Sequence, residues 1–336
     1  MAMNSKEEYK NIESIENINN SDMSLRGSKR AVAIHPPFAK GGCRSSERQG
    51  DFCNPLNSSP SSLFSNKYSF LMSVYAKEKP EYLKLALNSM MNQTVKPDEI
   101  VIVKDGALTD ELEEVLTSYS QKYPKIFNII ANPKNMGLGY SLNKGLEVCR
   151  NELVARMDSD DISFHERCEK ELKEFHNDES LSLIGAYVSE FTDSVDNVIS
   201  VRKVPLTQSK IYEFAKRRSA FNHPVVMFKK SKVLEIGGYS NLRRNQDVDL
   251  FGRMLFAGCK TCNIGESLLY FRTNNDLAKR RKSWENSRSY IGAIYRQFKM
   301  GYSTIFDFTI VAFAQIIMFL MPVSIQHFIY KYFLRK

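Results

Sequence analysis

The sequence predicts an α/β fold in which a mainly parallel central sheet carries helices on both faces. From Tyr68 onward, short apolar runs alternate with segments of helical spacing, and acidic residues directly follow two of the apolar runs. Strands that alternate with helices build parallel sheets through right-handed crossovers. Ligands of such sheets bind beyond the carboxyl ends of the strands, so the acidic residues mark the predicted site.

The first two predicted strands are each followed by a helix. Residues 70–75 form the first apolar strand, and Pro80 then begins a helix with an apolar face. The second buried strand, residues 100–103, ends at Lys104-Asp105-Gly106 and leads into a helix over residues 110–123. These residues therefore predict two consecutive β-α units.

Two further strands complete the predicted parallel part of the sheet. Residues 126–130 form the third strand, and the loop over residues 132–137 leads to a helix with Leu138, Leu142 and Leu146 on one face. A fourth strand, containing Leu153-Val154-Ala155, then delivers an acidic cluster. Two separate strand ends thus bring acidic residues to one edge of the sheet.

The acidic cluster is Asp158-Ser159-Asp160-Asp161, which we call the aspartate cluster. Carboxylates crowded at a strand end repel one another, so a cation is expected to offset their charge. The alternative interpretation, in which Asp161 or Ser163 caps a helix over residues 164–176, explains one side chain and leaves the other carboxylates without a role. The cluster therefore predicts a metal-diphosphate site.

Composition agrees with an anionic ligand. The 336 residues carry a formal net charge of +9, which suits a phosphorylated ligand, an acidic membrane surface or nucleic acid. Nucleic acid is disfavoured because no zinc, helix-turn-helix or RNP-like motif accompanies the charge. The six cysteines are sparse, and the first 20 residues lack the apolar core of a secretory signal, which favours a cytoplasmic site of action.

The order and spacing of several motifs resemble those of the family 2 glycosyltransferases, which have the GT-A fold. The resemblance runs from about Tyr68 to about Tyr270, and within the family it is most similar to bacterial exopolysaccharide and O-antigen transferases of the amylovoran-biosynthesis type. The motifs are Ser73-Val74-Tyr75, Ser89-Met90-Met91-Asn92-Gln93-Thr94, Glu99-Ile100-Val101-Ile102-Val103-Lys104-Asp105-Gly106, Asn135-Met136-Gly137-Leu138-Gly139, Asn143-Lys144-Gly145, Asp158-Ser159-Asp160-Asp161, Asn222-His223-Pro224, Gly237-Gly238-Tyr239 and Gln246-Asp247-Val248-Asp249-Leu250.

Composition and the resemblance together predict three parts of the chain. Residues 1–65 are polar and are expected to be a disordered extension. Residues 66–275 are expected to form the GT-A catalytic domain, and residues 276–336 basic and apolar helices that associate with a membrane.

For the donor, the resemblance implies a UDP-sugar bound with Mn²⁺ or Mg²⁺. Asp158 and Asp160 correspond to the DxD element that contacts ribose and metal, with Asp161 as a further ligand or its neighbour. Asp105 corresponds to the residue that binds the uracil, with Tyr75 packed beside it, and Asn135 is assigned to the same nucleotide-sugar site. An ordinary Asp-Gly turn at Asp105, and a turn-shaping role for Asn135, are the alternatives.

For the acceptor, the resemblance implies Asp247 as the catalytic base of an inverting transfer. Gln246 stands where the family usually has Glu, and its carboxamide is expected to orient the acceptor hydroxyl. The alternative for Asp247 is an acid favoured by a helix N-terminus. His223 is expected to touch the diphosphate or acceptor, or else to be a buried histidine that satisfies a loop. Cys259 and Cys262 are interpreted as inert thiols.

The C-terminal region predicts membrane contact. Residues 308–330 carry no Asp, Glu, Lys or Arg, and basic residues flank the segment on both sides. Positive charge at both ends favours a hairpin or an interfacial helix over a single crossing, and a buried packing helix is the alternative.

Together these features predict a non-processive hexosyltransferase that moves galactose or a related sugar from a UDP-sugar to a polyprenyl-diphosphate-linked acceptor in bacterial surface polysaccharide synthesis. It would act at the cytoplasmic face of the inner membrane as a peripheral or monotopic protein. A catalytically inactive sugar-nucleotide-binding scaffold is the alternative, because Gln246 departs from the family pattern.

Overall fold

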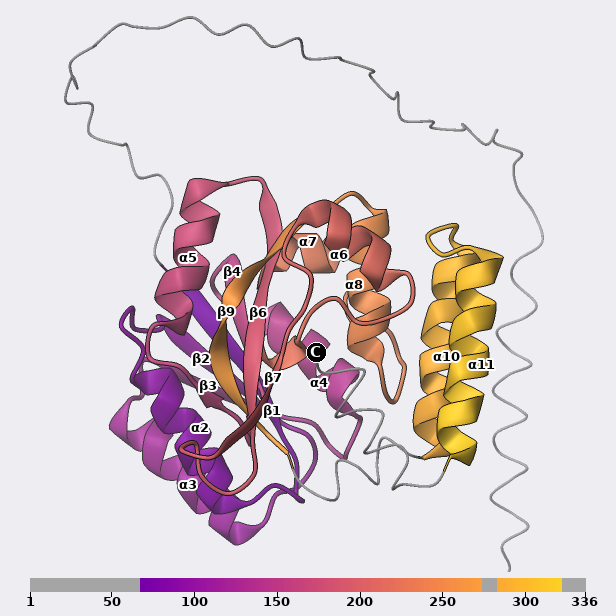
Figure 1. Ribbon diagram of the computed structural model, residues 1–336. Coiled ribbons are helices and arrows are strands. Elements are labelled where there is room, and N and C mark those ends of the chain that lie inside the picture. The colour runs from indigo at the N-terminus through magenta and orange to yellow at the C-terminus, as the bar shows by residue number, and fades with distance from the viewer. Residues whose placement is uncertain (1–66, 274–282, 322–336) are drawn as a thin grey trace, which may run out of the picture. The chain divides into compact units, whose positions relative to one another are not determined.

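A computed structural model describes residues 67–273 and 283–321 of the chain (Figure 1). The expected disordered extension, residues 1–65, lies outside the described residues, as do residues 322–336 of the apolar tail. The described strands form one nine-stranded sheet in the order β3-β2-β1-β4-β8-β6-β9-β5, with β7 paired to β6.

The strands are β1 (Tyr68–Val74), β2 (Glu99–Lys104), β3 (Phe127–Ala131), β4 (Leu153–Met157), β5 (Ile162–Ser163), β6 (Leu181–Phe191), β7 (Val198–Arg202), β8 (Met227–Lys229) and β9 (Lys260–Arg272). The helices are α2 (Pro80–Met91), α3 (Asp110–Lys122), α4 (Leu138–Val148), α5 (Arg167–Asn177), α6 (Gln208–Ala215), the 3₁₀ turn η1 (His223–Val225), α7 (Lys230–Glu235), α8 (Gln246–Phe256), α10 (Trp284–Lys299) and α11 (Ile305–Leu320).

The predicted parallel arrangement is confirmed for the four strands that lead to the aspartate cluster. β1 pairs in parallel with both β2 and β4, and β2 pairs in parallel with β3. The second half of the sheet is mixed, because β8 joins β4 and β6 by antiparallel ladders whereas β6 and β9 run parallel. The carboxyl ends of β1, β2 and β4 therefore share one edge.

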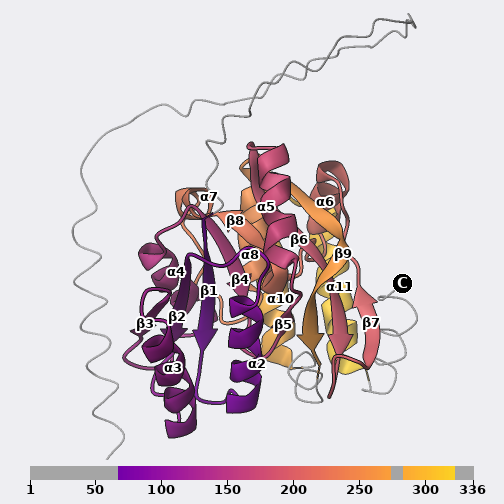
Figure 2. The ribbon, with the colours of Figure 1, turned by 90° about the vertical axis from the view of Figure 1, so that its left-hand side faces the viewer.

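Alternating side chains along the strands build a core on each face of the sheet. In β1, Phe70 and Met72 belong to the core beneath α2, α3 and α5, whereas Leu71 belongs to the core beneath α4, α6 and α8. In β4, Ala155 lies in the first core and Val154 in the second. Figure 2 shows α2, α3 and α5 in front of the sheet, with α10 and α11 behind it. The prediction of helices on both faces is confirmed.

One predicted helix starts later than expected. The helix predicted over residues 164–176 is α5, which begins at Arg167 with Glu166 as its N-cap. Ser163 lies in β5 instead, and Asp161 accepts a hydrogen bond from the backbone of Arg272. The helix-capping interpretation of Asp161 and Ser163 is therefore wrong.

The last two described helices, α10 and α11, pack on α8. Ala293 and Ile294 of α10, Val311 of α11 and Val248 of α8 form a small apolar cluster of their own. The capping box that begins α11 joins the side chains of Thr304 and Asp307 to each other's backbone amides. Within residues 67–273 and 283–321, no helix combines the length and apolar character needed to cross a membrane.

Candidate active site

The three carboxylates of the aspartate cluster converge just beyond β4. Ligand oxygens of Asp158, Asp160 and Asp161 all lie within 4.8 Å of one another. Asp161 is buried, whereas Asp158 and Asp160 are half-buried. Strand β4 thus ends in a cluster whose geometry suits a hard cation with oxygen ligands.

Crowding and burial perturb these carboxyl groups. Burial, together with the charges of Asp158 and Glu78, raises the pKa of Asp160 to about 7. The pKa of Asp161 also lies well above its usual value, because it is buried and faces Asp160 and Asp158. A bound cation would favour the ionised forms of Asp160 and Asp161, and it would thereby lower the pKa of both carboxyl groups.

Asp161 supplies a second observation that fits a cation site. Its Oδ1 accepts the backbone N–H of Arg272 at 2.8 Å. Its Oδ2 is buried and has no hydrogen-bond partner among the described residues. Since buried polar atoms are nearly always satisfied in native proteins, this oxygen fits a metal ligand.

Three charged residues that the sequence did not single out complete the surroundings of the cluster. Glu78, in the loop after β1, accepts a hydrogen bond from the Ser159 hydroxyl. Arg156 forms an ion pair with Asp158, and the Nε of Arg272 donates to the Asp160 carbonyl at 2.9 Å. Four carboxylates thus face two guanidinium groups, and when all are ionised one divalent cation balances the excess. The residues present fit such a cation.

Asp105 organises the loop that precedes α4. Its carboxylate accepts the backbone N–H groups of Met136, at 2.7 Å, and Gly137, at 2.9 Å, as well as the side-chain amide of Asn132 at 3.0 Å. Gly106 has a φ of 90°, and a Cβ there would lie 2.8 Å from the backbone nitrogen of Asn135. The backbone therefore bends at Gly106 in a conformation that favours glycine, and contact of Asp105 with a uracil stays a prediction.

Tyr75 and Asn135 lie beside this turn, as the donor-site prediction requires. Asn135 donates from its side-chain amide to the carbonyl of Asp105 at 3.4 Å. Tyr75 is half-buried directly after β1, and its carbonyl accepts the backbone N–H of Glu78 at 3.0 Å. Their contacts with a nucleotide stay predictions. The sequence analysis did not single out Asn132, although its position directly after β3 could have indicated a role at this edge of the sheet.

Asp247 lies in the first turn of α8, and Asn245 precedes the helix with a left-handed φ of 55°. Burial raises the pKa of Asp247, against the opposing effects of the backbone amides at the helix start and of Arg156, while Asp158 raises it further. That influence places Asp247 within electrostatic reach of the aspartate cluster. A raised pKa suits a general base, a role that stays a prediction.

The neighbours of Asp247 on α8 have separate environments. Gln246 is buried, and its Oε1 has no hydrogen-bond partner among the described residues. Asp249 lies on another face of the helix and binds the Nε of Arg253 at 2.9 Å. Arg253 in turn donates to the carbonyls of Ile236 and Gly238, so Asp249 supports, through Arg253, the turn that follows α7.

His223 is buried in η1 and its Nε2 lies 2.8 Å from the hydroxyl of Tyr239. Burial and the nearby charge of Arg156 lower the pKa of His223 well below its usual value, so the imidazole is neutral. The burial expected in the alternative interpretation is confirmed, but the partner of His223 is the side chain of Tyr239 and not a loop backbone group. Direct contact with diphosphate or acceptor stays a prediction.

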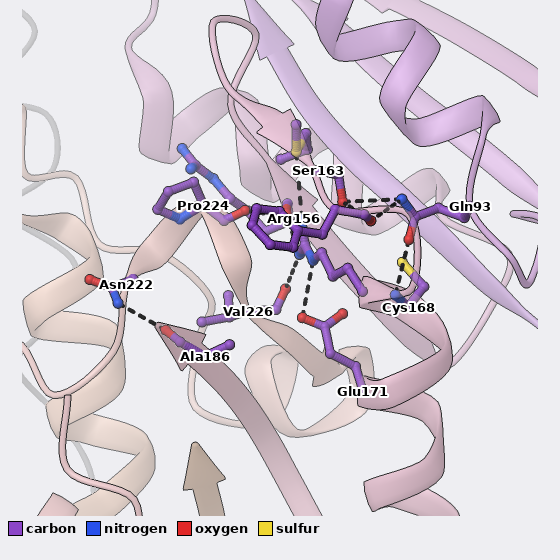
Figure 3. Close-up of polar contacts among 12 residues, drawn as sticks. Gln93, Arg156, Ser163, Cys168, Glu171, Ala186, Asn222, Pro224 and Val226 are labelled. Atoms are coloured by element: carbon purple, nitrogen blue, oxygen red, sulfur yellow. Dashed lines mark hydrogen bonds and ion pairs between the residues drawn. The ribbon is translucent and has the colours of Figure 1, made fainter. Parts of the chain in front are cut away.

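A buried network behind β4 fixes the strand that carries the cluster (Figure 3). Arg167 donates to Glu171 at 3.0 Å and to the carbonyls of Arg156, at 2.8 Å, Pro224 and Val226. It therefore ties α5 to β4 and to the segment after His223. On the same side, Gln93 donates to the Phe164 carbonyl at 2.8 Å.

The cysteines in the described part of the chain are free thiols: Cys149, Cys168, Cys259 and Cys262. Burial raises the pKa of Cys259, and it raises that of Cys262 to about 11. Both shifts disfavour the reactive thiolate, in agreement with the interpretation of inert thiols.

A mixed sheet with an acidic cluster directly after β4 is the arrangement expected of a glycosyltransferase of the GT-A type. Residues 69–235 match glycosyl transferase family 2, and the chain belongs to that family. It is 37% identical over 270 residues to the Escherichia coli UDP-Gal:alpha-D-GlcNAc-diphosphoundecaprenol beta-1,3-galactosyltransferase, covering 80% of this chain and 97% of the relative. It is 33% identical over 264 residues to the amylovoran biosynthesis glycosyltransferase AmsE of Erwinia amylovora, covering 79% and 98%.

Solved structures share the fold at low sequence identity. The mannosyltransferase PcManGT of Pyrobaculum calidifontis, in complex with GDP-Man and Mn²⁺, matches with a TM-score of 0.56 at 13% identity, covering 79% of this chain and 73% of that one. Staphylococcus aureus TarS 1-349 in complex with UDP matches with a TM-score of 0.52 at 14% identity, covering 80% and 72%. The protein is therefore a glycosyltransferase with a GT-A-like fold, as predicted.

Proposed function

We propose that this enzyme transfers a hexose, with galactose as the first candidate, from a UDP-sugar to a sugar linked to a polyprenyl diphosphate. The observation that carries the proposal is the 37% identity to the E. coli galactosyltransferase, whose name specifies this kind of donor and acceptor and of which the chain covers 97%. The second support is the relation to AmsE of amylovoran biosynthesis. The pathway would be that of a bacterial surface polysaccharide.

The reaction is a single displacement. The acceptor hydroxyl oxygen forms the new bond to the anomeric carbon, the bond from that carbon to the UDP oxygen breaks, and Asp247 takes the hydroxyl proton. One displacement at one carbon inverts the configuration, so an α-linked UDP-sugar gives a β-linked product. Gln246 lies beside the base and can only orient groups, because a carboxamide does not accept a proton at neutral pH.

Asp158, Asp160 and Asp161 would hold Mn²⁺ or Mg²⁺, and the cation would supply charge stabilisation to the departing diphosphate. Asp105, with Tyr75 and Asn135 beside it, would position the nucleotide at the end of β2, which β1 separates from β4. Arg272 closes this side of the site, because its guanidinium stacks 3.8 Å from the ring centroid of Tyr82 while its backbone N–H holds Asp161.

The enzyme would act at the cytoplasmic face of the inner membrane as a peripheral protein. Helix α11 exposes a band of large apolar side chains to solvent: Ile305, Phe306, Ile310, Phe313, Ile316, Ile317 and Leu320. Arg217 lies over the ring of Phe306 at 5.9 Å, and Arg296 and Lys299 lie in the last turn of α10. Apolar side chains bordered by basic ones suit the interface of an anionic membrane, where a lipid-linked acceptor resides.

The test combines donor, acceptor and metal. Purified protein is incubated with UDP-galactose, a GlcNAc-diphosphate-lipid analogue and Mn²⁺, with each component omitted in turn. We expect UDP release and a β-linked disaccharide product only in the complete mixture. Asp247→Asn should lower kcat by about 10²- to 10⁴-fold while UDP binding persists, because only the proton acceptor is lost.

If the protein is an inactive scaffold, we expect the opposite result in this assay. A scaffold would bind UDP-sugar and show no transfer to any lipid-diphosphate acceptor, and restoring the family's acid with Gln246→Glu would then switch turnover on. Transfer by the wild-type chain, with Gln246 in place, rejects the scaffold.

A further inference from the structure

Two adjacent arginines, Arg243 and Arg244, lie in the loop between α7 and α8, directly before the helix that carries Asp247. Both face one carboxylate of α10. The Nε of Arg243 lies 3.4 Å from Oε1 of Glu285, and the Nε of Arg244 lies 3.4 Å from Oε2. The two guanidinium groups therefore converge on one anionic group, and together with Glu285 they leave an excess of one positive charge.

The ion pairs with Glu285 leave both arginines available to a more highly charged ligand. Their distances of 3.4 Å exceed the roughly 2.8 Å of a charge-assisted hydrogen bond. The side chain of Arg243 is 86% exposed and that of Arg244 is 30% exposed. The Nε of Arg244 has no hydrogen-bond partner among the described residues. An anion can thus bind to the pair without breaking a close contact, because ion pairs of this kind at the surface are weak.

Helix α10 holds the loop that carries the two arginines. The Ser289 hydroxyl donates to the carbonyl of Arg244, and the side-chain amide of Asn245 donates to the carbonyl of Asn286 at 3.2 Å. The loop therefore presents the arginines at a fixed place beside the start of α8. Since Arg244 precedes Asp247 by three residues, the two Cα atoms are at most about 11 Å apart.

An exposed apolar surface adjoins the arginine pair. Trp284 precedes Glu285 at the start of α10, and its ring packs on that of Phe319 in α11 with the centroids 5.3 Å apart. Trp284 is 48% exposed, and Leu320 at the end of α11 is 73% exposed. A partly exposed tryptophan beside basic residues is typical of a membrane interface. A lipid with an anionic head group matches both parts of this surface.

We propose that Arg243 and Arg244 bind the diphosphate of the acceptor, while its polyprenyl chain passes Trp284 and Phe319. The inference rests on the proposed function, which supplies the class of acceptor. In a monosaccharide acceptor, one pyranose ring separates the reacting hydroxyl from the diphosphate, so the diphosphate site has to lie near Asp247, as this loop does. A guanidinium group matches phosphate oxygens in bidentate geometry, and two guanidinium groups balance the two charges of a diphosphate diester.

Binding of farnesyl diphosphate tests the inference without any transfer reaction. This probe has an isoprenoid chain and a diphosphate but no sugar, and calorimetric titration in a neutral detergent excludes anionic lipid. Arg243→Gln and Arg244→Gln are each expected to weaken its binding about tenfold, because each removes a charged hydrogen-bond donor. They should also reduce the preference of the protein for farnesyl diphosphate over farnesyl monophosphate. Arg243→Gln decides the matter should Arg244→Gln not fold, because Arg243 is 86% exposed.

The control is Arg218→Gln, which removes an exposed arginine after α6 and should bind the probe as the wild type does. Failure of the wild type to bind the probe, wild-type binding by both variants, or an equal loss in Arg218→Gln would each overturn the inference. An equal loss of affinity for UDP with Mn²⁺ would also overturn it, by placing the arginines at the donor. Weaker binding to phosphatidylglycerol vesicles, with unchanged probe binding in detergent, would assign the arginines to membrane head groups instead.

Kinetics separate this inference from the proposed function. With UDP-galactose and the GlcNAc-diphosphate-lipid analogue, Arg243→Gln and Arg244→Gln should raise the KM of the acceptor about tenfold and leave kcat and the KM of the donor within about twofold. A loss of kcat with an unchanged acceptor KM would show a merely structural role and contradict the inference. Absence of galactose transfer in the wild type would refute the proposed function, and the farnesyl diphosphate titration would still decide the role of the two arginines.

Discussion

Two buried arginines on opposite sides of the same strand show how differently the site and its support are built. Arg167 has its guanidinium engaged by Glu171 and by three backbone carbonyls, those of Arg156, Pro224 and Val226. Arg156 has one partner, Asp158, and two nitrogens without one among the described residues. The guanidinium of Arg167 thus has protein partners for all its nitrogens, whereas that of Arg156 has nitrogens left that could bind a ligand.

This difference in hydrogen bonding distinguishes the residues that support catalysis from those that support folding. Asp161 Oδ2 and Gln246 Oε1 share the unsatisfied state of Arg156, and all three lie around the predicted donor and acceptor sites. In the supporting layer, Glu171 Oε2 also lacks a partner among the described residues, and burial raises the pKa of Glu171 to about 7 against the lowering effect of its ion pair with Arg167. Substitutions at the cluster should therefore change catalysis, and substitutions behind it should change folding.

The largest effect is expected at Asp160. Asp160→Asn should reduce kcat by about a thousandfold, because it removes a ligand of the cation that stabilises the departing diphosphate. It should also raise the melting temperature at about pH 8, because burial and the charges of Asp158 and Glu78 destabilise the ionised carboxylate. Steady-state kinetics and thermal melting test both. Asp193→Asn, on an exposed loop, is the control, and a loss of stability in Asp160→Asn would contradict the comparison.

Next in size is the effect of Arg167→Met. Removing one partner of a buried ion pair leaves Glu171 uncompensated, so the free energy of unfolding should fall by about 3 to 5 kcal/mol. Replacing both partners, with Arg167→Met and Glu171→Leu together, should recover a large part of the loss. Denaturant titration measures each variant, with Arg288→Met on the exposed face of α10 as the control. Equal stability of Arg167→Met and wild type would show that the layer is not structural.

The pH dependence of stability gives a smaller effect at the same pair. Because the folded-state pKa of Glu171 is raised to about 7 from the model-peptide range, folding takes up a proton at intermediate pH. The stabilisation that Glu171 gives the folded state by taking up this proton is complete below about pH 4. It is lost as the pH rises through about 7, which lowers the free energy of unfolding by on the order of 1 to 3 kcal/mol. The stability advantage of wild type over Glu171→Gln should therefore shrink from pH 5 to pH 8, about the range set by those pKa values. An advantage that grows with pH would contradict the assignment.

The smallest effect concerns the apolar band on α11. Phe313 is 67% exposed, and Phe313→Glu should weaken binding to anionic lipid vesicles about tenfold by placing a charge at the membrane interface. Leu234→Glu, an equally polar change at an exposed position of α7, should leave vesicle binding unchanged. Co-sedimentation with vesicles measures both. Equal binding of Phe313→Glu and wild type would remove α11 from the membrane proposal.

Sequence reasoning reached the parallel half of the sheet because each strand there is a continuous apolar run followed by a helix. It found Asp105, Asp158 and Asp247 because they lie in motifs at element ends. It did not find Glu78, because the partner of Glu78, Ser159, becomes its neighbour only when the ends of β1 and β4 come together.

The second half of the sheet was harder to predict for a similar reason. β8 has three residues, and it joins β4 to β6 by antiparallel ladders that no local pattern specifies. The predicted start of α5 was too early because serine is a common helix N-cap. In the structure, Ser163 pairs with Leu269 of β9 instead. Tertiary pairing overrides a local capping signal there.

The most direct test of the active site is a crystal structure with UDP and Mn²⁺, with the metal located by its anomalous scattering. We predict one metal peak coordinated by carboxylates of the aspartate cluster and by the diphosphate, with the uracil beside Asp105. A metal peak away from Asp158, Asp160 and Asp161, or UDP bound at another edge of the sheet, would contradict the assignment of the site.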